Sequence, residues 1–214
     1  MYFAQSPTKE ELDKLRGFSK VVFSLNGVES ESSAIERNAS MLAENSRSYP
    51  NVVGAMIDDL SSQYISPQGR YKLSPDELGG IRRALNRRNP SLKLYGVFYT
   101  MNFDLDLASY VHHVDVVSLW IWENIRDLRG LDSYVAQCPK IFPGKPILLG
   151  LYLFDFPSNQ LMPMDLLKFE FENAAQYIRE KKIVGFQILG RYSRDDLETP
   201  QARWIRRFVQ DNFE

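Results

Sequence analysis

The sequence predicts an α/β protein and, within that class, a small or incomplete (β/α) barrel of the TIM type. Short, nearly continuous apolar runs alternate with amphipathic stretches six times, which is typical of parallel strands covered by helices. Acidic, amide or aromatic residues follow several of these runs, as they do at barrel mouths. The nucleotide-binding patterns GxGxxG and GxxxxGK[ST], which often mark open doubly wound sheets, are absent from the sequence. These three observations favour the barrel.

Chain length fits one domain, which we expect to cover residues 1–214. A complete barrel typically has about 250 residues. Six strands are clear, and residues 1–4 read as the end of a seventh. The predicted barrel is therefore small or incomplete, and an open doubly wound sheet is the alternative.

The predicted strands are short runs rich in β-branched and aromatic residues. They cover residues 21–25, 52–57, 94–99, 114–121, 147–153 and 183–189.

Helix start signals and amphipathic stretches separate these strands. Thr8 and Glu11 have the spacing of a capping box. Ser74 before Pro75 predicts a capped helix with proline in its first turn, and Thr199 before Pro200 predicts a last helix that ends near Phe213. The remaining helices are expected at residues 31–46, 125–137 and 164–181.

Composition and charge limit the kinds of partner that we expect this protein to have. The net charge of −1 gives no overall field for nucleic acid, and no apolar run is long enough to predict a membrane span. One cysteine, Cys138, excludes an internal disulfide, and we expect it to be structural. The compartment stays open: a soluble cytosolic protein and a secreted or periplasmic protein with its signal removed both fit. The sequence does not indicate an oligomeric state.

The segment NVVGAMIDDL ends an apolar run in two adjacent acids, Asp58 and Asp59. Strand alternation places Asp58 on the same face as Gly54 and Met56, which we expect to be the barrel interior. Asp59 is expected to point away or into the following loop. Adjacent carboxylates repel each other, so their position at a predicted strand tip favours a functional site. A capping role for Asp59 through Ser61 or Ser62 is the structural alternative.

Other predicted strand tips carry acids, aromatic rings and amides. Carboxyl groups can cleave glycosidic bonds, aromatic faces stack on sugar rings, and amides bind hydroxyls. We therefore predict Asp58, Asp59, Glu123 and Asp155 as candidate catalytic residues. Candidate substrate-binding residues are Asn26, Tyr99, Trp120, Trp122, Tyr152, Gln187 and Arg191. The aromatic residues could instead be core, and Asp155 could only shape the turn before Ser158.

Other chemistries find less support. His112 and His113 adjoin the start of a strand, away from the predicted mouth, and adjacent histidines make a poor metal site. A divalent ion at Asp58 and Asp59 lacks further ligands at suitable spacing. The serine-hydrolase pattern GxSxG is absent. The sequence predicts no metal and no cofactor.

Four segments together resemble a group of largely uncharacterised bacterial TIM-barrel proteins related to glycoside hydrolases: GAMIDDL, VDVVSLWIWE, KPILLGLYLFDF and KKIVGFQILGR. The resemblance covers roughly residues 20–212. It implies a sugar-related barrel and singles out Asp58, Asp59, Trp120, Trp122, Tyr152 and Asp155. The chain departs from the DxxDxDxE pattern of family 18 chitinases, so the mechanism of that family is not transferred.

Three functions follow as hypotheses. The first is a glycoside-hydrolase-like enzyme in which Asp58 pairs with Glu123 or Asp155. The second is a non-catalytic carbohydrate-binding barrel. The third is a lyase or isomerase that acts on a small sugar or acid, with Arg191 as an anion clamp. All three predict a carbohydrate or another small molecule as the ligand.

Overall fold

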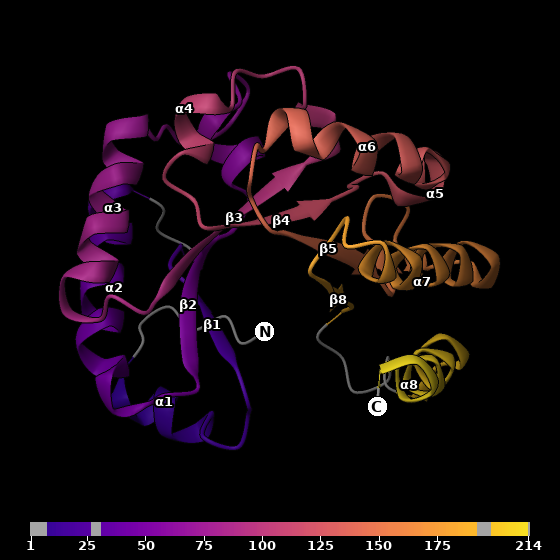
Figure 1. The fold of residues 1–214 in the computed structure, drawn as a ribbon, viewed down its shortest axis with the longest axis horizontal. Coiled ribbons are helices and arrows are strands. Elements are labelled where there is room, and N and C mark those ends of the chain that lie inside the picture. The colour runs from indigo at the N-terminus through magenta and orange to yellow at the C-terminus, as the bar shows by residue number, and fades with distance from the viewer. Residues whose placement is uncertain (1–7, 27–30, 192–197, 214) are drawn as a thin grey trace. The chain divides into compact units, whose positions relative to one another are not determined.

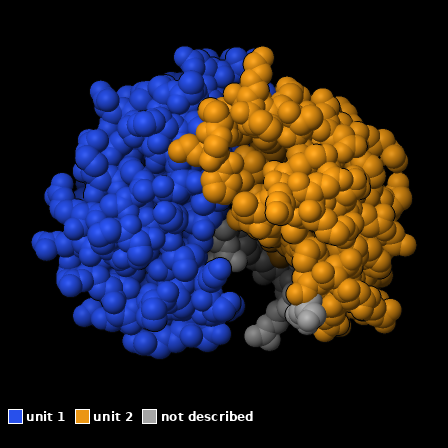
Figure 2. Space-filling view, in the orientation of Figure 1, with its two compact units in different colours: residues 1–117 blue, residues 118–214 orange. Residues whose placement is uncertain are grey.

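The computed structural model describes residues 8–26, 31–191 and 198–213. The predicted seventh strand at residues 1–4 lies outside them. The chain divides into two compact units, residues 1–117 and 118–214 (Figure 2). The boundary falls within one strand of the main sheet, Val116–Trp120.

The main sheet confirms the predicted fold class, an incomplete (β/α) barrel. Its six strands are hydrogen-bonded in chain order (Figure 1). Pairing is parallel between the first two neighbouring pairs and between the last two strands. Sequential order is that of a barrel, whereas a doubly wound sheet reverses its strand order at a switch point. The strands are β1 (Val21–Ser24), β2 (Val52–Ile57), β3 (Lys93–Tyr99), β4 (Val116–Trp120), β5 (Ile147–Tyr152) and β8 (Gly185–Leu189).

Helices separate the strands, as predicted. The described helices of residues 1–117 are α1 (Lys9–Lys14), α2 (Ser32–Asn45), α3 (Pro75–Arg88) and α4 (Ala108–Val111). Those of residues 118–214 are α5 (Asn124–Asp127), α6 (Leu131–Ile141), α7 (Met164–Arg179) and α8 (Pro200–Phe213).

The sequence interpretation missed the short helix α4, and it differs from the structure in other places as well. The helix predicted at 125–137 is divided into α5, a 3₁₀ turn η4 (Leu128–Gly130) and α6. The break includes Gly130, and glycine is unfavourable inside a helix. A short antiparallel pair, β6 (Phe154–Asp155) and β7 (Gln160–Leu161), was not predicted. It follows β5 directly and carries one of the candidate acids.

Helix α3 begins where the sequence predicts. The Ser74 hydroxyl accepts a hydrogen bond from the Glu77 backbone N–H at 3.3 Å, and the Glu77 carboxylate accepts one from the Ser74 N–H at 2.8 Å. Pro75 occupies the first turn, where its missing N–H costs nothing. This capping box fixes the start of α3, which lies beside α2 (Figure 1).

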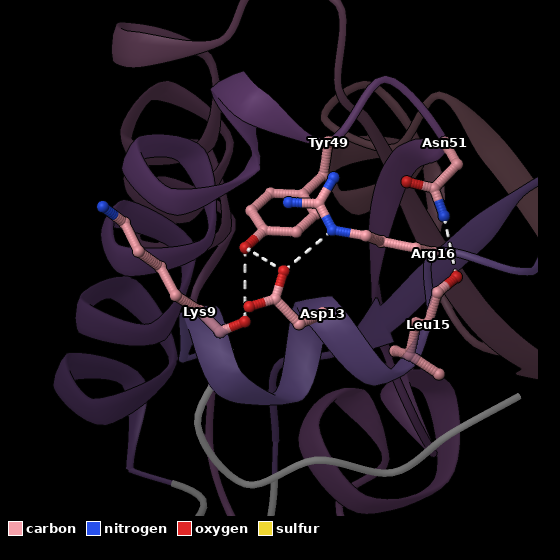
Figure 3. Close-up of polar contacts among 6 residues, drawn as sticks. All are labelled: Lys9, Asp13, Leu15, Arg16, Tyr49 and Asn51. Carbon is pink, nitrogen blue, oxygen red and sulfur yellow. Dashed lines mark hydrogen bonds and ion pairs between the residues drawn. The ribbon is translucent and has the colours of Figure 1, made fainter.

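Helix α1 is held against the start of β2 by a polar network (Figure 3). The Tyr49 hydroxyl donates to an Asp13 carboxylate oxygen at 3.0 Å, and Arg16 donates to the same oxygen at 2.8 Å. The Arg16 guanidinium also lies 4.4 Å from the centre of the Tyr49 ring. The amide of Asn51 donates to the Leu15 carbonyl at 2.9 Å. These contacts close one end of the first unit, and the candidate acids lie at the other end of β2.

Apolar side chains fill each unit. In α2, Ile35, Ala39 and Leu42 are buried at helical spacing and form the stripe that packs inward. In the second unit, the Phe171 ring of α7 contacts Phe186 of β8, with ring centres 5.6 Å apart, and it also contacts two rings of α8. Cys138 is buried in α6, and burial raises the pKa of its thiol to about 12.

Candidate functional site

Asp58 follows the last residue of β2, so the buried strand delivers its carboxyl group to the strand tip. Two causes, first burial and then the neighbouring charge of Asp59, raise the pKa of Asp58 to about 6. The Asp59 backbone N–H donates to Asp58 Oδ1 at 3.1 Å and opposes part of this shift. A carboxyl group with this pKa holds its proton in mildly acidic solution.

Asp59 lies in the left-handed backbone region, with φ 53° and ψ 27°, which non-glycine residues seldom adopt. It precedes a one-turn π-helix, η2 (Leu60–Ile65), a rare element that is frequent at functional sites. Its carboxylate accepts a hydrogen bond from the Tyr99 hydroxyl at 2.5 Å. The Asp59 side chain therefore reaches the tip of the neighbouring strand β3.

Asn26 holds the backbone of Asp58. Its side-chain amide donates to the Asp58 carbonyl at 2.8 Å and accepts from the Asp58 N–H at 2.8 Å. Two such bonds extend the pairing of β1 with β2 by one residue. Asn26, predicted to bind substrate, thus has its amide engaged by the strand tip, where it positions Asp58.

Two buried residues at this tip, Ser61 and Asn102, were missed by the sequence interpretation. The Ser61 hydroxyl donates to Asn102 Oδ1 at 2.9 Å and accepts from the Tyr99 N–H at 2.9 Å. They tie η2 to the end of β3 and so support the contact between Tyr99 and Asp59. Serine and asparagine after a strand are common in loops, and no sequence signal separates this pair from loop residues.

In the second unit, Trp120 is nearly buried, with 7% of its surface exposed. Its indole N–H donates to the Ser118 hydroxyl at 2.8 Å, and its ring lies on Gly150, where a Cβ atom would overlap it. The amide of Gln187 also donates to Ser118, while its Oε1 is buried without a hydrogen-bond partner. Trp120 therefore serves mainly to pack the interior, and Gln187 has one buried side-chain oxygen that accepts no hydrogen bond.

Trp122 is the more accessible ring, with 37% of its surface exposed. It lies nearly parallel to Phe156, at an angle of 9° with ring centres 6.2 Å apart. Tyr152 contacts both rings edge to face. The name aromatic surface is used below for Trp122 and Phe156 together with Tyr152, which is itself buried, with 1% of its surface exposed. Phe156, which was not predicted, belongs to this surface through the turn between β6 and β7.

The candidate acids of the second unit already have partners. Glu123 precedes α5 and forms an ion pair with Arg126. Asp155 is 2% exposed, and its Oδ2 accepts hydrogen bonds from the backbone N–H of Ser158 at 3.0 Å and from the Ser158 hydroxyl. Its Oδ1 is buried without a hydrogen-bond partner. The Arg191 guanidinium lies 4.6 Å from the centre of the Phe154 ring.

Glu170 of α7 is a buried acid that the sequence interpretation missed. It is 0% exposed, and burial raises its pKa well above the usual value. The backbone N–H of Tyr152 opposes part of this shift, but neither carboxyl oxygen makes a hydrogen bond of good geometry. Glu170 lies four residues after Leu166 and four before Ala174, on the buried stripe of α7, so helical spacing was the signal that could have found it.

The structure brings the predicted residues together in two groups. Asn26, Asp58, Asp59 and Tyr99 meet in the first unit, and Trp120, Trp122, Tyr152 and Gln187 gather in the second. Pairing of Asp58 with Glu123 or Asp155 would join the two units and stays a prediction.

Within the described ranges, no group of three His, Cys, Asp or Glu residues could hold a metal ion. Nor does any helix there have the length and apolar character needed to cross a membrane.

No protein-family model and no curated protein matches this sequence. Among solved structures, the chain is similar to a family 18 chitinase from Crocus vernus, with a TM-score of 0.60 and 12% identity over 99% of this chain and 80% of that one. It is also similar to active domain 2 of a Pyrococcus furiosus chitinase (0.56; 13%; 88% and 67%). A third is xylanase XynB of Paenibacillus barcinonensis (0.55; 11%; 91% and 75%). At these identities the likeness shows the fold alone: the chain has an incomplete form of the barrel found in glycoside hydrolases.

Proposed function

We propose that this protein acts on carbohydrate and that Asp58 is its proton-donating carboxyl group. One observation carries the proposal: Asp58 ends a barrel strand with a pKa of about 6. A glycosidase needs an acid that is still protonated near its working pH, and a buried carboxyl group supplies one. The glycoside hydrolase structures with the same fold support a carbohydrate ligand.

Asp59 has a distinct part in this proposal. The Tyr99 hydroxyl donates a hydrogen bond that holds the Asp59 carboxylate in place, and the charge of Asp59 raises the pKa of Asp58. Asp59 follows Asp58 directly, so the two carboxyl groups share one strand tip. Hydrolysis needs a second carboxyl group across the scissile bond, separated by about 5–5.5 Å in retaining enzymes or about 6.5–9.5 Å in inverting ones. The sequence offers Glu123 and Asp155 for that role, and Glu123 is the one that we propose, because the carboxylate of Asp155 is engaged by Ser158.

The test is turnover of oligosaccharides by the wild type and by Asp58→Asn. Asparagine keeps the shape and the acceptor for the Asp59 N–H but cannot donate the carboxyl proton. We expect turnover to fall by roughly a hundredfold or more, in line with the loss of a general acid. Asp104→Asn is the matched control, because Asp104 is an exposed acid of the same unit. Full activity in Asp58→Asn would remove Asp58 from the mechanism.

A second candidate function is carbohydrate binding without hydrolysis. It is favoured by the partners of Glu123 and Asp155, since an ion pair and a turn already occupy these acids. This alternative predicts saccharide binding by the wild type with no turnover. Binding would then survive Asp58→Asn and weaken in Trp122→Ala.

A further inference from the structure

The turn between β6 and β7 carries a ring to the aromatic surface. The antiparallel pair places Phe154 opposite Leu161 and Asp155 opposite Gln160. Phe156 is the first residue after this pair, and its ring contacts Trp122, Tyr152 and Phe154. The position of that ring therefore depends on the conformation of four residues, 156–159.

Asp155 fixes this turn. Its Oδ2 accepts from both the N–H and the hydroxyl of Ser158, and the Ser158 oxygen also accepts from the Gln160 amide at 3.0 Å. Asn159 has a φ of 52°, the left-handed conformation that asparagine tolerates better than most residues. The hydrogen bonds to the Asp155 side chain and the backbone conformation of Asn159 therefore favour the same conformation of the turn.

We infer that Asp155 is a positioning residue, which holds Phe156 parallel to Trp122 so that the two rings together bind the C–H face of a sugar ring. The inference rests on the proposed function, because it names the part of the second unit that binds the saccharide. It also gives Asp155 a different role from the catalytic one suggested by the sequence. Phe156 becomes a residue that determines how strongly the sugar is bound.

The substitutions Asp155→Asn and Asp155→Ala separate the two roles. Asparagine can still accept the hydrogen bond from the Ser158 N–H, whereas alanine cannot. A catalytic acid loses its function in both variants. A positioning residue loses it only in the alanine variant, so Asp155→Asn should bind and turn over saccharide nearly as the wild type does.

Binding is measured by calorimetry with chitohexaose and with xylohexaose. We expect Phe156→Ala and Asp155→Ala each to weaken binding roughly three- to tenfold, the range for loss of one aromatic contact. In the double variant the two losses should not multiply, because Asp155 acts through Phe156. Phe213→Ala, which removes a partly exposed ring of α8, is the control and should bind as the wild type does.

A second readout needs no saccharide. The indole N–H resonance of Trp122, assigned with Trp122→Phe, should shift in Phe156→Ala and in Asp155→Ala but stay in place in Asp155→Asn. An unchanged resonance in Asp155→Ala would overturn the positioning role. Saccharide binding by the wild type that is unaffected in Phe156→Ala would overturn this inference and leave the proposed function intact. Failure of the wild type to bind either saccharide would count against the proposed function and against the sugar-binding half of this inference together.

Discussion

The strand tips of the first unit and those of the second are built differently. At the ends of β2 and β3, polar groups hold one another: Asn26 binds the Asp58 backbone, and Tyr99 binds Asp59. At the ends of β4 and β5, aromatic rings pack together while Glu123 and Asp155 bind neighbours in their own loops. One barrel scaffold thus presents a carboxyl group with a raised pKa in one half of the chain and an aromatic surface in the other.

This difference shows that an acid after a buried strand is a weak functional signal by itself. Asp58 and Asp155 both follow apolar runs, yet their carboxyl groups are held differently. Burial, and then the charge of the neighbouring Asp59, raise the pKa of Asp58, whereas Asp155 accepts hydrogen bonds from Ser158 and fixes a turn.

The largest expected effect on stability distinguishes Trp120 from Trp122 in the second unit. Trp120→Ala removes a ring that is packed on Gly150 and should cost about 3–5 kcal/mol of unfolding free energy. Trp122→Ala removes a more exposed ring and should cost about 1 kcal/mol, the scale of its aromatic contacts. Chemical denaturation measures both values. Equal losses would show that the two rings do not differ in role.

The next effect concerns the pH dependence of the first unit. The pKa of Asp58 is raised in the folded protein, so its protonated form favours folding. That contribution is complete below pH 3.8 and is lost as the pH rises through about 6. Asp58→Asn should therefore stabilise the protein at pH 7 by on the order of 2–3 kcal/mol. Denaturation at pH 4 and pH 7 tests this, and an equal effect at both values would contradict it.

A similar prediction applies to Glu170 in the second unit. Its pKa is also raised by burial, so its contribution to stability falls as the pH rises above 4.5. Glu170→Met fills the same space without a carboxyl group and should stabilise the protein at pH 7 by about 1–3 kcal/mol, the cost of a buried polar group without partners. A loss of stability at pH 7 would show that the carboxyl group is satisfied in solution.

The smallest effect is expected at Glu123. Its ion pair with Arg126 is exposed to solvent, and exposed pairs contribute little to stability. Glu123→Gln should leave the melting temperature unchanged, while turnover decides whether it is the second carboxyl group of the mechanism. Retained turnover would remove Glu123 from the mechanism, and abolished turnover would favour it.

The sequence predicts the fold well and the site only in part. Apolar runs locate every strand of the main sheet, and β2 has the predicted bounds, because burial on both sides leaves a continuous signal. Asp58 was found for the same reason, since it ends such a run. The role of Asn26 could not be predicted, because hydrogen bonds from a side chain to one backbone atom or another leave no pattern in the sequence. The contact of Asp155 with Ser158 is the turn that the sequence offered as the structural alternative. Phe156 was missed because the placement of a turn depends on tertiary contacts, and Glu170 was missed although it shares the helical spacing of the buried residues of α7.

The most direct test of this account is the titration of the Asp58 carboxyl group, followed by NMR of its side-chain carbon and assigned with Asp58→Asn. The account predicts a midpoint near pH 6, from burial and from the charge of Asp59. A midpoint near 3.8, the ordinary value for aspartate, would contradict the assignment of Asp58 as the proton donor.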